Sequence, residues 1–183
     1  MIQKQTLIMT LINMFTHNPK LHNTKYKQPP RSKLRGILSI KNFGIPITGS
    51  LKGLKGAIVF DPDAPEKGKV NLSVDATTID TGIGIRNTHL KKKEYLDVNT
   101  HPFISFESNK IEKDGNRWIA QGKISMKEIT KDIVIPFEVI GNKDELQFKG
   151  EFNLNRNDFE IGGNSLSMAD ELTVTFLIAT NPQ

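Results

Sequence analysis

The sequence of 183 residues contains no cysteine, so disulfides, thiolate metal sites and cysteine nucleophiles are all excluded. It also has no run of roughly 18 apolar residues, the length that a membrane-spanning helix needs. Tyrosine and tryptophan are scarce, with 2 and 1 residues, whereas phenylalanine occurs 10 times. A hydrophobic fraction of 37% and a charged fraction of 25% are typical of a folded globular protein rather than a disordered one.

Acidic residues are absent from the first third of the chain. Residues 1–60 hold ten lysines and arginines and no Asp or Glu, which leaves 15 basic against 20 acidic residues for residues 61–183. A basic segment can bind nucleic acid or an anionic membrane. Here its charges are scattered among Pro, Asn and Thr, without the regularly placed aromatic side chains on which bases stack. We therefore expect no nucleic-acid binding.

Residues 1–31 differ in composition from the rest and are predicted to be an N-terminal extension, followed by a single domain over residues 32–183. Leu7, Leu11 and Met14 recur at helical spacing. The apolar stretch fits either a degenerate secretory signal, since no A-x-A cleavage site follows it, or a short amphipathic helix with a linker. The sequence leaves both alternatives open.

From residue 33 onward the chain shows about eight short runs with period-two alternation, separated by Gly, Pro, Asn and Asp, which is the pattern of antiparallel strands. The second run is residues 56–60, because the glycines before it indicate turns. One short helix is expected, capped by Thr88 and running through Leu96. Closure removes the unpaired edges of apolar strands, so the sequence predicts an all-β fold, an eight-stranded antiparallel β-barrel with one short helix.

An eight-stranded barrel has an interior that is either filled by side chains or just wide enough for one slender ligand. The alternation does not decide between these two alternatives. If the barrel holds a ligand, the ligand is expected to be apolar, because the inward faces carry almost no ionisable group. The candidate ligand-binding residues are Ile58, Phe60, Val70, Leu72, Val74, Phe106, Ile124, Ile135, Phe137, Phe148, Phe152, Val174 and Phe176.

His89, with Arg86 and Asp97, is the one group in the domain that could act in acid–base chemistry, since a carboxylate can orient a histidine beside a cation. No nucleophile or metal partner accompanies it, so we expect these residues to fix a helix and loop at one end of the barrel. The four histidines lack the spacing of zinc sites. We therefore predict no catalytic residues, no metal site and no enzyme activity.

Several blocks of sequence, in order, resemble the YceI-like family. They are GLKGAIVFD (53–61), TGIGIRNTHL (81–90), EYLDV (94–98), PFISFES (102–108), GKISMK (122–127) and RNDF (156–159). Asn87, Glu128 and Glu160 depart from the family pattern, as does the direct step from residues 29–33 into the first strand. A pattern of several ordered blocks is more specific than any single short motif.

The resemblance implies a lipocalin-like barrel that binds polyisoprenoids. The expected function is therefore binding, with sequestration or transport, of a long-chain isoprenoid or similar lipid such as a quinone, without a cofactor. The alternative is a stress-response or interaction module with a filled barrel. The resemblance implies a periplasmic or secreted location, with the cytoplasm as the alternative, and it leaves peripheral membrane contact and a homodimer open.

Overall fold

The computed structural model describes residues 24–27, 35–42, 45–142 and 145–182. The strands are β1 (Thr24–Lys27), β2 (Arg35–Asn42), β3 (Ile45–Phe60), β4 (Lys69–Asp80), β5 (Phe103–Asp114), β6 (Arg117–Met126), β7 (Ile129–Asn142), β8 (Glu145–Asn155) and β9 (Met168–Pro182). The helices are α2 (Gly84–Leu90) and the 3-10 turns η1 (Pro65–Lys67) and η2 (Arg156–Phe159). None of the helices in these ranges has the length and apolarity to span a bilayer. The apolar stretch near the N-terminus lies outside the described residues.

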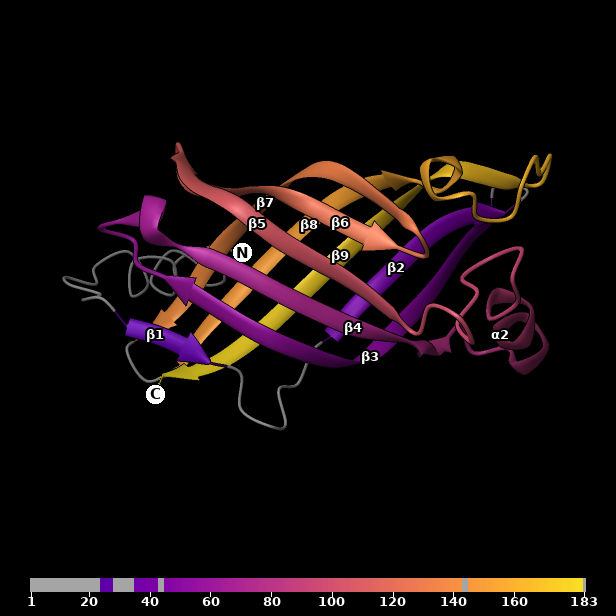
Figure 1. Ribbon diagram of the computed structural model, residues 1–183, viewed down its shortest axis with the longest axis horizontal. Helices are drawn as coiled ribbons and strands as arrows, with labels where there is room; N and C mark the ends of the chain where they lie inside the picture. Colours follow the sequence, from indigo (N-terminus) through magenta and orange to yellow (C-terminus); the bar gives the residue numbers. More distant parts are fainter. Residues whose placement is uncertain (1–23, 28–34, 43–44, 143–144, 183) are drawn as a thin grey trace, which may run out of the picture.

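The strands of the described chain form one antiparallel sheet in the order β1-β3-β2-β9-β8-β7-β6-β5-β4. The sheet is curled, because β3 pairs with β4 as well as with β2, and β1 pairs with β9 as well as with β3 (Figure 1). The expected turn at Asp114 and Gly115 joins β5 to β6 in register. The predicted all-β antiparallel class with one α-helix is confirmed for the described residues.

The pairing of β3 with β4 is irregular where β3 carries glycines. Residues 45–51 of β3 pair with β2, and the part that follows pairs with β4 after register shifts between Ser50 and Lys55. Within and just beyond these shifts, Gly53 and Gly56 have φ angles of 75° and 125°. A Cβ atom at Gly56 would overlap with the carbonyl of Asn71. Only glycine fits there, and the irregularity bends the strand where its register with β4 shifts.

This geometry corrects the expected second strand. Residues 56–60 are only the end of β3, and the glycines that we assigned to turns lie within the strand. The strand count also differs, because nine strands are present in the described residues where eight were expected. The additional strand, β1, falls within residues 1–31, which we assigned to the extension. The boundary between extension and domain stays a prediction.

The helix also differs from the prediction. It begins at Gly84, with Ile83 as the N-cap, and ends at Leu90. Thr88 is therefore inside the helix, where its hydroxyl donates to the Gly84 carbonyl at 3.1 Å, rather than at its start. The residues that follow form turns, since the backbone of Leu96 donates to Leu90 and that of Asp97 to Lys92. The expected helical course through Leu96 is wrong.

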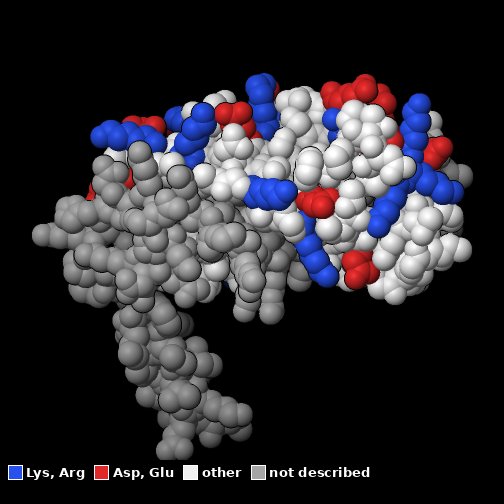
Figure 2. All heavy atoms as spheres, turned by 60° about the horizontal axis from the view of Figure 1, so that its bottom comes forward, with Lys and Arg blue, Asp and Glu red and all other residues white. Residues whose placement is uncertain are grey.

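Buried side chains form two clusters inside the curled sheet. One contains Phe60, Phe137 and Phe148 with aliphatic residues of β3, β4 and β9, and the other contains Ile124, Leu154 and Phe159. Lys, Arg, Asp and Glu side chains lie interspersed over the outer face that Figure 2 shows. This contrast follows from the period-two alternation, which sends successive side chains of a strand to opposite faces.

Candidate functional site

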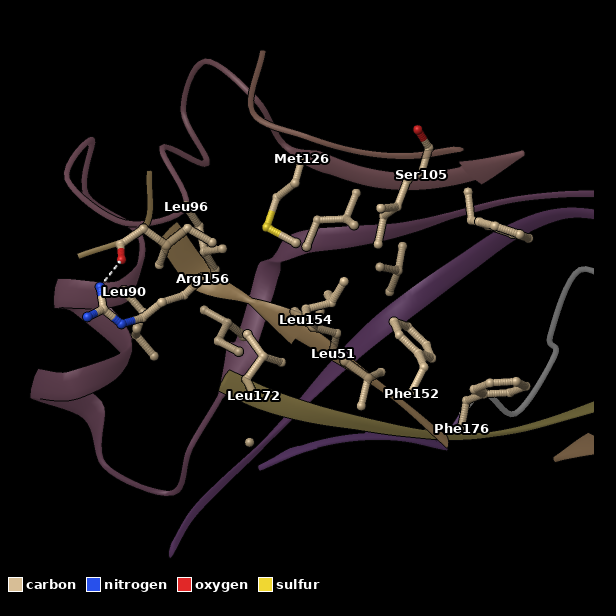
Figure 3. A pocket seen from close by; sticks show the side chains of 18 of the residues that line it. Leu51, Leu90, Leu96, Ser105, Met126, Phe152, Leu154, Arg156, Leu172 and Phe176 are labelled. Carbon is tan, nitrogen blue, oxygen red and sulfur yellow. Dashed lines mark hydrogen bonds between the residues drawn. The ribbon is translucent and has the colours of Figure 1, made fainter. Parts of the chain in front are cut away.

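A cavity of about 620 Å³ lies inside the curled sheet and is lined by side chains from both clusters. Leu51, Phe152, Leu154 and Phe176 reach toward it from β3, β8 and β9 (Figure 3). The volume is within the range of roughly 300–1,000 Å³ that is usual for small-molecule sites. Most of the lining is apolar, so the space suits a hydrocarbon ligand.

The structure brings the candidate residues of the sequence analysis together around this cavity, with one exception. Those that line it are Ile58, Val70, Leu72, Val74, Phe106, Ile124, Ile135, Phe137, Phe148, Phe152, Val174 and Phe176. Phe60 is outside the lining and is packed at one end, with 1% of its surface exposed. That these residues bind a ligand stays a prediction.

Other lining residues were missed by sequence reasoning. Some of them lie two positions before or after a candidate residue on the same strand, so extending the alternation would have identified them. They are Ile104, Met126, Leu154, Leu172 and Ile178. Leu90 and Leu96 come instead from α2 and the turn that follows it. No local pattern marks these two residues, because only the long-range packing of this segment brings them to the cavity.

Aromatic rings close one end of the cavity. The Phe60 ring lies edge-on to Trp118, with ring centroids 5.0 Å apart and an interplanar angle of 86°. It has a similar contact with Phe148 at 5.7 Å and 89°, and Phe137 completes the group at 5.9 Å. Edge-to-face geometry is favoured by the ring quadrupoles. We call Phe60, Trp118, Phe137 and Phe148 the aromatic end.

At the other end the cavity reaches α2, whose residues Ile85, Arg86, His89 and Leu90 line it, and the segment 161–168. Ile85 is 71% exposed and Leu166 is fully exposed. Both α2 and the segment that leads into β9 lie far from the aromatic end, at the right of Figure 1. We call this the open end.

Hydrogen bonds fix α2 against the end of β4. Arg86 donates from Nε to the Thr81 hydroxyl and from Nη2 to the Thr81 carbonyl, both at 2.8 Å. Asn87 accepts on Oδ1 from the backbone and the hydroxyl of Thr81, at 2.8 and 2.6 Å. The departure from the family pattern at Asn87 therefore leaves a side chain that still holds this loop.

The candidate acid–base group of Arg86, His89 and Asp97 is not assembled in the structure. Arg86 and His89 line the cavity, whereas the Asp97 carboxylate accepts from the Thr100 hydroxyl at 3.2 Å and does not line it. Asp97 serves the turn after α2, with a φ of 46°. No group of His, Asp and Glu within the described ranges is arranged to hold a metal ion.

Arg156, in η2, is the most deeply buried charged residue of the open end, with 1% exposed. Its guanidinium donates to the carbonyls of Ile161 at 2.8 Å, Gly163 at 2.6 Å and Ala169 at 3.0 Å. Figure 3 shows the Arg156 side chain at this end of the cavity, near Leu90 and Leu96. It also pairs with Asp170 at 2.8 Å. Arg156 therefore fixes the segment that borders the cavity, a role that the RNDF block alone could not reveal.

The carboxylate of Asp80, at the end of β4, accepts two hydrogen bonds. The backbone N–H of Gly82 and the side-chain amide of Asn87 donate to Asp80, and together they hold its pKa below the ordinary value. Asp80 is engaged by these two donors and does not line the cavity.

Fold and cavity together define a class: an antiparallel all-β protein that encloses an apolar space beside one short helix. A model of the YceI-like domain matches residues 27–180. The chain belongs to the YceI-like family, which confirms the resemblance drawn from the sequence blocks.

Similar sequences are found among known bacterial proteins. A UPF0312 protein of Pectobacterium carotovorum is 28% identical over 169 residues, which cover 88% of each chain. The protein YceI of Escherichia coli O157:H7 is 28% identical over 119 residues, or 62% of each chain.

Solved structures show the same fold. BcnA of Burkholderia cenocepacia superposes with a TM-score of 0.77 at 24% identity, over 80% of this chain and 96% of that one. A polyisoprenoid-binding domain from Saccharophagus degradans has a TM-score of 0.63 at 11% identity, over 88% and 99% of the two chains. At these identities the likeness shows the fold alone.

Proposed function

We propose that this protein binds a long-chain isoprenoid or similar lipid inside a closed, eight-stranded, lipocalin-like barrel formed by β2 to β9, and that it sequesters or transports that lipid. The observation that carries the proposal is the apolar cavity of about 620 Å³. The pairing of β3 with both β2 and β4 supports a closed barrel. The polyisoprenoid-binding domain with the same fold supports the class of ligand.

Burial of the hydrocarbon would supply the affinity. Each buried CH₂ contributes about 0.8 kcal/mol, whereas association costs on the order of 4–15 kcal/mol, so only a long chain gains a useful surplus. The filled-barrel alternative, a stress-response or interaction module, draws no support from an interior with this much space.

The test is organic extraction of natively purified protein, with mass spectrometry of the extract against a mock purification. A stoichiometric long-chain lipid is expected, and so is uptake of added polyprenol. The matched variants are Val74→Phe, which fills the cavity, and Val134→Phe, on the outer wall where Val134 is 55% exposed. Lipid should be lost only from Val74→Phe. An empty extract with no uptake of polyprenol would overturn the proposal.

We further propose that lipid enters and leaves at the open end during transient contact with a membrane. The exposed apolar side chains beside the cavity support this route, since Ile83 is 48% exposed, Ile85 is 71% exposed and Leu166 is fully exposed. Apolar side chains gathered at one end of a protein commonly mark an interaction site. We propose a periplasmic or secreted location, which cell fractionation tests against the cytoplasmic alternative.

A further inference from the structure

Among Lys, Arg, His, Asp and Glu, the residues that line the cavity are all basic. They are Arg86, His89 and Arg156, and no Asp or Glu belongs to the lining in the described part of the chain. All three border the open end, on α2 and η2. An apolar cavity with cationic groups and no acid at its entrance is chemically suited to an amphiphile with an anionic head.

Arg156 is not available to such a head. Its Nε, Nη1 and Nη2 atoms donate to the carbonyls of Ala169, Ile161 and Gly163 and to the carboxylate of Asp170. With 1% of its surface exposed, it is a structural residue of the rim.

Arg86 differs from Arg156 because it keeps free hydrogen-bond donors and has no ion-pair partner in the described part of the chain. It uses Nε and Nη2, each on Thr81, and its Nη1 has no hydrogen-bond partner among the described residues. Nor does any carboxylate in those ranges form an ion pair with it. Because Thr81 is itself held by Asn87, the guanidinium is fixed in place with donor capacity to spare.

His89 adds a second donor on the same side of α2. It lies three residues after Arg86, a spacing that places the two side chains on one face of a helix. Both line the cavity, and the side chain of His89 has no hydrogen bond or ion pair within the described ranges. Two acids of the flanking segments have other partners: Asp80 accepts from Gly82 and Asn87, and Asp97 accepts from Thr100.

We propose that Arg86 and His89 form a head-group site for an oxyanion, a carboxylate or a phosphate, at the end of a hydrocarbon chain that fills the cavity. The arginine fork matches both groups. This inference rests on the proposed lipid-binding function and adds selectivity to it. The protein prefers acidic amphiphiles over neutral ones of the same chain.

The test compares oleyl alcohol, oleic acid and oleyl phosphate, each displacing the neutral fluorescent probe N-phenyl-1-naphthylamine from the full-length protein. The acid and the phosphate are expected to bind about tenfold or more tightly than the alcohol, as charge-assisted hydrogen bonds allow. Added salt should reduce this preference and leave the alcohol unchanged. Whichever of oleic acid and oleyl phosphate binds more tightly shows whether the site prefers a carboxylate or a phosphate head group.

Variants of Arg86 and His89 test whether these residues cause the preference for acidic ligands. Arg86→Gln should lower the affinity for the acid to that for the alcohol without changing the alcohol, and His89→Gln should do so in part. The control is Arg117→Gln, which should change neither affinity, because Arg117 is an exposed residue at the start of β6 and does not line the cavity. Thermal unfolding of each variant checks that it folds, and the comparison of ligands on the unaltered protein needs no variant.

The outcomes are separable. Equal affinity for alcohol, acid and phosphate overturns the head-group site while leaving lipid binding intact. An acid preference that survives Arg86→Gln in a folded protein also overturns it. If none of the three ligands displaces the probe or is taken up, the proposed lipid-binding function itself fails.

Discussion

The aromatic end and the open end of the cavity are closed and shaped by different forces. At the aromatic end, Phe60 makes edge-to-face contacts with three other rings and is almost fully buried. At the open end, Arg156 and Arg86 hold loops through directional hydrogen bonds, and apolar side chains such as Ile85 remain exposed. Close packing of rings forms one end, whereas directional hydrogen bonds of loops form the border of the other.

The comparison predicts the largest loss of stability at the aromatic end. Phe60→Ala should lower the free energy of unfolding by about 3–5 kcal/mol, because a large, fully packed side chain leaves a cavity. Phe152→Ala should cost less, since Phe152 already faces open space on one side. Urea denaturation of both variants measures the difference. Equal losses would mean that the space beside Phe152 is filled in solution.

Arg156 is expected to dominate the stability of the open end. Arg156→Met should cost about 3 kcal/mol, because it leaves the carbonyls of Ile161, Gly163 and Ala169 without a donor in a buried place. The control is Asp170→Asn, which should cost about 1 kcal/mol or less, since the Asp170 side chain is 59% exposed. Hydrogen exchange of the amides of residues 161–170 should accelerate in Arg156→Met alone. Unchanged exchange of these amides would show that Arg156 does not hold this segment in place.

The exposed apolar side chains of the open end should matter for membrane contact and not for folding. Ile85→Ser combined with Leu166→Ser should change the free energy of unfolding by less than about 0.5 kcal/mol, as surface substitutions usually do. Flotation with phosphatidylglycerol vesicles should show weaker binding of this variant. The matched control, Val134→Ser, removes an exposed apolar side chain from the outer wall. If it weakens flotation equally, the open end has no special role.

The two ends also differ in how far the sequence predicts them. Alternation identified Phe137 and Phe148 as inward residues, because period two in a strand reports directly which face a side chain occupies. The same alternation placed Phe60 in the lining of the cavity, although Phe60 packs at one end of it, because alternation does not report the position of a side chain along the length of the cavity.

The open end escaped prediction for a related reason. Arg156 is buried by carbonyls of a segment that begins five residues later, and Arg86 meets Thr81 across a loop. Such contacts depend on backbone paths that no periodicity encodes. The bulge in β3 was likewise missed, because Gly53 and Gly56 look the same in a turn and in a bent strand.

The smallest predicted effects concern two carboxylates, one toward each end. The pKa of Asp80 is lowered mainly by the N–H of Gly82, and that of Glu112, on β5, mainly by its hydrogen bond with Lys110. A lowered folded-state pKa stabilises the protein above the ordinary values of 3.8 and 4.5, and this stabilisation disappears as the pH falls through the folded-state pKa.

The native protein should therefore be more stable than Asp80→Asn and Glu112→Gln at neutral pH, and both differences should narrow in acid. Salt should separate the two sites, because the partner of Glu112 is an exposed lysine whose charge is screened, whereas the first partner of Asp80 is a neutral backbone N–H. Urea denaturation across pH, at low and high salt, measures both. A difference for Asp80→Asn that stays constant down to the acid limit would show that the Gly82 hydrogen bond does not favour the charged form.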